Sequence, residues 1–170
     1  LDSAWFDYDV DGLPDLFVTG VGFITSFNMA VNSVLYRNNG DGTFSDVTQE
    51  AGIDRKHGGL SVLVADFTND GLMDIYVPFW RTRGDMNRRR ADPGLPIGKV
   101  NRLYINSGRG FFTEALDSGL EHLGNSISAT TGDFDNDGFL DVYLGTGGPQ
   151  FQEQDRLYRN NGDGTFLDIT

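Results

Sequence analysis

The chain has 170 residues, 25 of them acidic and 13 basic, and its formal net charge is −12. This acidic balance argues against nucleic acid as the main partner. The absence of cysteine excludes disulfides and cysteine-based metal sites. A hydrophobic content of 38% is enough for a globular core, and no apolar run reaches membrane-spanning length. Because 21 of the acids are Asp, a short side chain suited to turns and metal loops, the bias favours sites over general solubility.

The chain opens on a predicted strand, residues 1–6, which is not a signal peptide and leads into an aspartate pattern that occurs three times. The copies run over residues 7–15, 66–74 and 133–141, and each reads D-x-(D/T)-x-D-G-x-x-D. Oxygen-bearing side chains at positions 1, 3, 5 and 9, on a loop bent by glycine at position 6, suit a hard cation. Calcium takes about six to eight oxygen ligands in irregular geometry, so it is the natural guest. Without a cation, the carboxylates of each loop would repel one another.

A second shared element follows each loop, at residues 33–48, 101–114 and 155–170. Its Asn-Gly-Asp-Gly segment, present in the first and third copies, is a strong signal for a tight hairpin, because such turns need positive φ angles. In the middle copy we predict strands at 60–65, 74–77, 102–106 and 111–115. No segment shows a sustained, capped 3.6-residue period, so almost no helix is expected.

Three repeats of four short strands predict an all-β fold, a β-propeller segment of three four-stranded antiparallel blades. We expect the first blade with its linker at 1–59, the second at 60–126 and the third at 127–170. A propeller ring has about four to eight blades, and three alone would leave two sheet faces uncovered. The sequence therefore predicts a part of a larger propeller, with further blades of the same chain as partners.

The middle repeat carries a basic insert, predicted at 79–100, that interrupts the strand pattern. Proline and glycine make it an irregular surface loop, and loops on a propeller face usually carry binding. Its bases are Arg81, Arg83, Arg88, Arg89, Arg90 and Lys99. The tripeptide Arg83-Gly84-Asp85 spells a sequence that integrins read, but the neighbouring bases are more simply a solvated loop or a patch for an acidic surface.

The aspartate loops, the Leu-Tyr-Arg-Asn-Asn-Gly-Asp-Gly-Thr-Phe element and the segment at 46–53 resemble the FG-GAP/VCBS repeats. The likeness is greatest to propellers of the ASPIC/UnbV and cartilage acidic protein type, and integrin α-subunit heads use related blades. The resemblance covers essentially the whole chain. It implies a propeller of about seven blades with one Ca²⁺ in the hairpin between strands one and two of each.

The resemblance also implies the ligands of three calcium sites: the side chains at loop positions 1, 3, 5 and 9 and the carbonyl at position 7. The first set is Asp7, Asp9, Asp11, the Leu13 carbonyl and Asp15. The second set is Asp66, Thr68, Asp70, the Leu72 carbonyl and Asp74. The third set is Asp133, Asp135, Asp137, the Phe139 carbonyl and Asp141. Since Thr68 brings no charge, we expect the second site to be the weakest.

Other interpretations of these residues are weaker. An EF-hand needs a Glu at loop position 12 and flanking helices, whereas position 12 is Val18, Val77 and Leu144 and the flanks are strands. The two histidines, His57 and His122, lie in linkers, where a packing role outweighs a catalytic one. Three tyrosines recur on strand three and indicate packing between blades more than a sugar platform. They are Tyr36, Tyr104 and Tyr158.

The function predicted from these features is a calcium-binding module of an extracellular, cell-surface or periplasmic protein that binds a protein or glycan ligand, with a role in adhesion. No catalytic residue set can be argued from spacing, and we expect no enzyme activity in this segment. Two alternatives stay open at this point. The chain could be part of a propeller-type polysaccharide lyase or hydrolase, or a structural component of a surface fibre.

Overall fold

The computed structural model describes residues 2–20, 32–55, 58–79, 100–147 and 153–170. Twelve strands in these ranges form three four-stranded antiparallel sheets, and no helix occurs among them. Within each sheet the strands lie in chain order, so that each is hydrogen-bonded to the next one along the sequence. The predicted all-β fold of three four-stranded blades is confirmed.

Each sheet is one repeat of the sequence. The first sheet contains β1 (Ser3–Phe6), β2 (Asp15–Val18), β3 (Val34–Asn38) and β4 (Phe44–Asp46). The second contains β5 (Leu63–Ala65), β6 (Asp74–Val77), β7 (Arg102–Asn106) and β8 (Phe112–Glu114). The third contains β9 (Ser126–Gly132), β10 (Asp141–Thr146), β11 (Arg156–Asn160) and β12 (Phe166–Asp168). We call these sheets blades 1, 2 and 3.

The predicted strands of blade 2 agree with the structure except at some ends. β6 and β7 have the predicted bounds, and β8 is one residue shorter at each end. β5 begins at Leu63, three residues after the predicted start. The reason is that the Val62 amide donates to the Asp2 carboxylate of blade 1 at 3.0 Å, and so joins two blades. β9 begins at Ser126, one residue before the predicted start of the third repeat.

Several predicted features lie outside the described residues. The described part of the chain stops at residue 79 and resumes at 100, so the basic residues of the insert and Arg83-Gly84-Asp85 are not described. The same holds for His57 and for most of the connection between β2 and β3, residues 21–31.

The hairpin that joins the first two strands has one geometry in all three blades. Each first strand ends directly opposite the last Asp of the aspartate pattern: Phe6 pairs with Asp15, Ala65 with Asp74 and Gly132 with Asp141. Position 4 of every loop has a positive φ of 58° to 63°, and the glycine at position 6 has one of 87° to 93°. The pattern is thus a single structural unit used three times.

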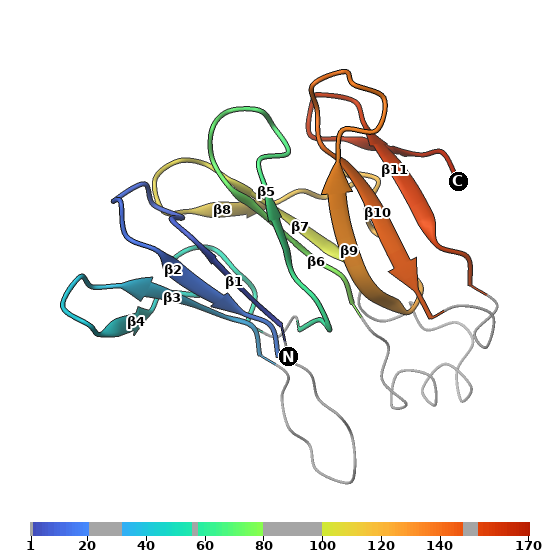
Figure 1. Cartoon of the computed structure of the whole chain (residues 1–170). Coiled ribbons are helices and arrows are strands. Elements are labelled where there is room, and N and C mark those ends of the chain that lie inside the picture. Colours follow the sequence, from blue (N-terminus) through green and yellow to red (C-terminus); the bar gives the residue numbers. More distant parts are fainter. Residues whose placement is uncertain (1, 21–31, 56–57, 80–99, 148–152) are drawn as a thin grey trace, which may run out of the picture.

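The hydrophobic cores lie between the sheets. One core joins blades 1 and 2, where Phe17 and Leu35 meet Tyr104 and Phe112. The other joins blades 2 and 3, where Phe67 packs edge-to-face on Phe166. Blade 2 lies between its neighbours (Figure 1) and all four residues of β6 are buried, because both faces of this sheet are covered. This is the layered arrangement of propeller blades.

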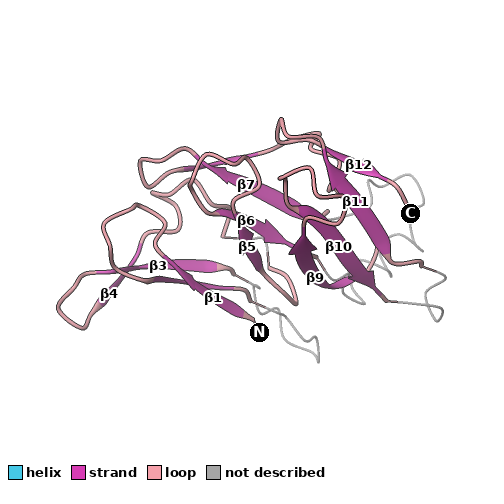
Figure 2. Cartoon of the chain, turned by 45° about the horizontal axis from the view of Figure 1, so that its top comes forward, coloured by secondary structure: helices cyan, strands magenta, loops and turns pink. Residues whose placement is uncertain are grey.

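The three aspartate loops extend from the same end of the sheets, toward the left and the top of Figure 1, and the second view shows the blades side by side in chain order (Figure 2). Each loop is also in contact with the adjacent blade, as the first loop shows. The side-chain amide of Asn106 in blade 2 donates to the Tyr8 carbonyl of the first loop at 2.9 Å. The fold therefore places the three candidate sites in a row on one edge of the array.

Position 4 of the first loop holds a β-branched residue in a left-handed conformation, which is expected to cost stability. Val10 has a φ of 63° and is 64% exposed, whereas Asn69 and Asn136 occupy the same position in the other loops. Left-handed backbone costs most residues about 1–2 kcal/mol, and Asn tolerates it best after Gly. Val10→Asn should therefore raise the free energy of unfolding by about 1 kcal/mol and the melting temperature by about 2–4 °C.

Thermal unfolding followed by circular dichroism measures this change. Val10→Ala is the control, since it removes the branch but keeps a residue that disfavours positive φ, and it should gain less. A melting temperature unchanged by Val10→Asn would contradict the argument.

Candidate metal centre

The first carboxylate of each loop organises the loop backbone. In the first loop both oxygens of Asp7 accept hydrogen bonds, from the amides of Asp11 at 3.1 Å and Gly12 at 2.8 Å. The Asp11 carboxylate in turn accepts from the Leu13 amide at 2.8 Å. These bonds explain why the pattern needs Asp at positions 1 and 5 and glycine at 6, where the chain turns back toward the second strand.

The other two loops repeat these bonds. Asp66 accepts from the amides of Asp70 and Gly71 at 3.1 and 2.9 Å. Asp133 accepts from the amides of Asp137 and Gly138, each at 3.0 Å. Backbone donors thus satisfy part of each carboxylate, and ionised carboxylate oxygens can accept further partners.

The last carboxylate of each loop is buried and ties the loop to its sheet. Asp15, Asp74 and Asp141 are at most 2% exposed. One Asp74 oxygen accepts from the amide of Phe67, at loop position 2, and the other from the amide of Asn106 at the end of β7, at 3.0 and 2.8 Å. Asp15 and Asp141 make the same pair of bonds in their own blades. A single carboxylate therefore joins strand two, strand three and the loop.

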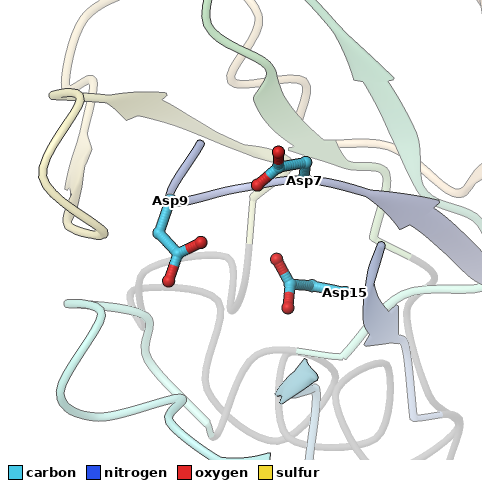
Figure 3. Close-up of side chains that lie close together, drawn as sticks. All are labelled: Asp7, Asp9 and Asp15. Atoms are coloured by element: carbon cyan, nitrogen blue, oxygen red, sulfur yellow. The ribbon is translucent and has the colours of Figure 1, made fainter. Parts of the chain in front are cut away.

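Three carboxylates converge in the first loop. Oxygens of Asp7, Asp9 and Asp15 all lie within 4.8 Å of one another, and Figure 3 shows the three groups facing one common space. In the third loop, Asp133, Asp135 and Asp141 form the same cluster. Positions 1, 3 and 9 are thus brought together, as a divalent ion with oxygen ligands requires.

Position 3 carries a sign of a missing partner. In the first loop, one oxygen of Asp9 is buried and has no hydrogen-bond partner. In the second loop, the hydroxyl oxygen of Thr68 is buried and lacks a partner in the same way. Buried polar atoms normally have partners, because leaving one without any costs free energy. Oxygen atoms of this kind are the ligands that calcium prefers, and Thr68 would supply the neutral ligand of the second loop.

Burial raises the pKa of carboxyl groups in the first and second loops. Burial raises the pKa of Asp74 to about 6, although the amides of Asn106 and Phe67 act in the opposite direction. Burial is also the main cause that raises the pKa of Asp9, and the neighbouring Asp11 adds to it. A bound cation would favour the charged forms and so reverse these shifts.

The remaining predicted ligands are the residues at loop positions 5 and 7. The position 5 residues Asp11, Asp70 and Asp137 are exposed, and each accepts the amide of position 7. They lie outside the two three-carboxylate clusters. The position 7 residues are half-buried: Leu13, Leu72 and Phe139. Their carbonyls, like the position 5 carboxylates, stay predictions as ligands.

One set of residues at the site was missed by the sequence argument. The third strand of each blade ends in an asparagine, and one residue separates it from the repeated Leu-Tyr pair. These residues are Asn38, Asn106 and Asn160. Asn106 and Asn160 are at most 2% exposed, and they bridge neighbouring loops. Their recurrence within the second shared element was a signal that could have identified them.

Residues considered for other roles lie away from the loops. Tyr104 and Tyr158 are buried in the two cores, as predicted for packing between blades. Trp5 is exposed and packs edge-to-face on Phe44 within blade 1. None of the described segments forms a helix that could span a membrane.

The sequence matches known proteins over most of its length. The family model described as FG-GAP-like repeat matches residues 5–77 and 89–144. Cartilage acidic protein 1 of Homo sapiens is 29% identical over 129 residues, a match that covers 74% of this chain and 17% of that protein. Cartilage acidic protein 1 of Mus musculus is 28% identical over the same shares.

The chain thus spans only a small part of the length of these two relatives. The family match covers all three aspartate loops, residues 7–15, 66–74 and 133–141, which are the parts with the repeated geometry. The chain belongs to the FG-GAP-like repeat family.

Proposed function

We propose that this repeat module binds one Ca²⁺ in each of its three aspartate loops and depends on these ions for its stability. The observation that supports this most directly is the unpartnered buried oxygen at position 3, in Asp9 and in Thr68. In the first loop it belongs to a cluster with the carboxylates of positions 1 and 9. Three divalent ions would change the formal net charge from −12 to −6. Since the loops close the first hairpin of each blade, binding free energy becomes folding free energy.

The module acts outside the cytoplasm in this proposal, as an extracellular, cell-surface or periplasmic binding unit. Calcium sites of extracellular modules have dissociation constants of about 10⁻⁴–10⁻³ M. We expect short loops that are exposed at one end of the sheets to bind calcium in that range. The connections between the second and third strands of each blade, at 19–33, 78–101 and 147–155, differ in length. On a rigid array such variable connections are the natural contacts for a protein or glycan ligand.

The face of blade 3 that points away from blade 2 exposes aromatic side chains whose equivalents are buried between blades. Phe134 is 49% exposed, whereas its equivalents Tyr8 and Phe67 are buried by the following blade. Tyr143 is likewise exposed, although its equivalent Tyr76 is fully buried between blades 2 and 3. The side chains of blade 3 thus offer the surface that a following blade covers in the two inner interfaces.

The opposite face of blade 1 has the matching features. Phe44 is 43% exposed, whereas Phe112 and Phe166, at the same place in blades 2 and 3, are buried against the preceding blade. Tyr36 is half-exposed where Tyr104 and Tyr158 are buried. In this proposal, further FG-GAP-like blades of the same protein cover both faces.

Removal of calcium tests the main proposal. At about 100 times the dissociation constant, one bound ion adds about 2.7 kcal/mol to the free energy of unfolding. A chelator should therefore lower the melting temperature by on the order of 5–10 °C for each site, and added calcium should restore it. Differential scanning calorimetry measures both steps, and the chelator saturated with calcium is the control. The same melting curve in chelator and in calcium would contradict calcium binding.

Two substitutions test the ligand assignment. Asp135→Ala removes a charged ligand and Thr68→Ala a neutral one, so in saturating calcium the first should cost more, up to about 2.7 kcal/mol. In chelator the order should change, because losing Asp135 relieves repulsion with Asp133 and Asp141. Urea unfolding in both conditions measures these differences. Thr68→Val controls for the lost methyl group, and equal costs in calcium would count against the assignment.

Self-association of the isolated chain tests the two outer faces. We expect concentration-dependent association in sedimentation experiments, because apolar side chains of both faces are available to a second copy. Phe134→Ser and Phe44→Ser should each weaken it. The control is Leu116→Ser, which removes an exposed apolar side chain that follows β8 in the middle blade. A chain that stays monomeric, or an equal effect of the control, would overturn the assignment of these faces.

A further inference from the structure

Asn106 and Asn160 each connect two neighbouring aspartate loops. Their backbone amides donate to the buried carboxylates of their own loops, Asp74 and Asp141, each at 2.8 Å. Their side-chain amides donate to the position 2 carbonyls of the preceding loops, Tyr8 and Phe67, each at 2.9 Å. One buried residue therefore contacts a candidate ligand of its own loop and the backbone of the preceding loop.

The side-chain amide groups of Asn106 and Asn160 make further hydrogen bonds within their own blades. The Asn160 side chain donates a second bond to the Leu140 carbonyl at 3.1 Å and accepts from the Gly162 amide at 2.9 Å. Asn106 does the same with Met73 and Gly108. Because every bond fixes the orientation of the amide, a shift of either loop is passed to the residue and from it to the other loop.

The carbonyl that each Asn holds lies at a sensitive place in the preceding loop. Phe67 stands between the candidate ligands Asp66 and Thr68, and its own amide donates to Asp74. The peptide groups on either side of position 2 are thus fixed by the loop itself and by the following blade. The direction in which Thr68 presents its buried oxygen depends on both.

A second bond joins only the second and third loops. The side-chain amide of Asn69, at position 4, donates to the Gly138 carbonyl at 2.9 Å. The residue at position 4 of the first loop is Val10, which has no donor in its side chain. The second and third loops therefore share two bonds between side chain and backbone, whereas the first and second share the Asn106 bond.

We propose that calcium binding at neighbouring loops is positively cooperative, with Asn160 and Asn69 as the positioning residues that couple the third loop to the second. This inference rests on the proposed calcium function. With an ion bound in the third loop, Asp141 and Gly138 would be held in place. Asn160 and Asn69, which bond to them, would then order the backbone around Thr68 before a second ion binds. The second loop then loses less conformational entropy when its own ion binds. The difference in binding free energy is the coupling free energy between the two sites.

The second loop gains most from this arrangement. It has one charge fewer than the other loops, and it lies between them. Coupling from both sides therefore raises the affinity of the loop whose own ligands are weakest.

Nuclear magnetic resonance can measure each loop separately, because every loop contains a glycine at position 6 whose amide reports on it. These glycines are Gly12, Gly71 and Gly138. In a calcium titration of the whole chain, Asp135→Ala should weaken the third loop directly. The calcium concentration at which Gly71 is half-shifted should rise about 5-fold or more, the lower end of usual coupling between sites, whereas the midpoint of Gly12 should move much less.

A matched pair of variants isolates the Asn69 bond. Asn69→Gly and Asn136→Gly both replace an exposed position 4 residue with one that accepts positive φ. Only Asn69 has a following aspartate loop among the described residues, so Asn69→Gly should raise the Gly71 midpoint and make it less sensitive to Asp135→Ala. Asn136→Gly should leave both unchanged. Asn160→Ala should have the larger effect in a protein that keeps a dispersed spectrum, and if it does not fold, the glycine pair still decides.

The outcomes separate the coupling from the calcium function itself. If no loop glycine shifts with calcium, the proposed function fails. If all three shift but Asp135→Ala leaves the Gly71 midpoint unchanged, or if the two glycine variants behave alike, calcium binds to independent loops and the coupling is overturned.

Discussion

The structure depends on a buried carboxylate at the start of the second strand of every blade. Asp15, Asp74 and Asp141 each accept one amide from their own loop and one from the third strand. A buried charge is costly unless it is paired, and two amide bonds satisfy only part of a carboxylate. In the proposed function, a cation held by the same group would complete it, and the residue that closes the sheet would also be a calcium ligand.

The packing between blades follows from the same unit. Because each hairpin is closed by its Asp at a fixed register, the residues on either side of it face fixed directions. Loop position 2 then lies against the following blade, and β6 presents Ile75 to one core and Tyr76 to the other. A repeat without disulfides can thus stack with small individual sheets, since each strand needs only three to seven residues to contribute to a core.

Much of this was readable from the sequence because it is local. The D-x-(D/T)-x-D-G-x-x-D spacing fixes the loop bonds, and the third-strand hairpin is set by glycines such as Gly40 and Gly42, both with positive φ. Features that depend on neighbouring blades were not readable. β5 begins late because Asp2 binds Val62 across an interface, and the bridging role of Asn106 needs the position of Tyr8. Such contacts join residues about 60 to 100 positions apart in different blades. The residue pattern within one repeat does not predict which residues of two blades will meet.

The threefold repetition gives the second loop support from both sides. A propeller blade is stabilised by its neighbours as well as by its own bonds. Under the proposed calcium function, a loop that binds its ion weakly would therefore be supported by the loops beside it. Thr68 lowers the charge of the second loop, yet this loop contacts both others through Asn106, Asn160 and Asn69. Reduced charge in the middle of the row further lessens repulsion between adjacent acidic loops before any ion binds. Under the proposed calcium function, the loop with the fewest charges would therefore lie where its neighbours best compensate a loss of calcium affinity and where excess charge would cost most.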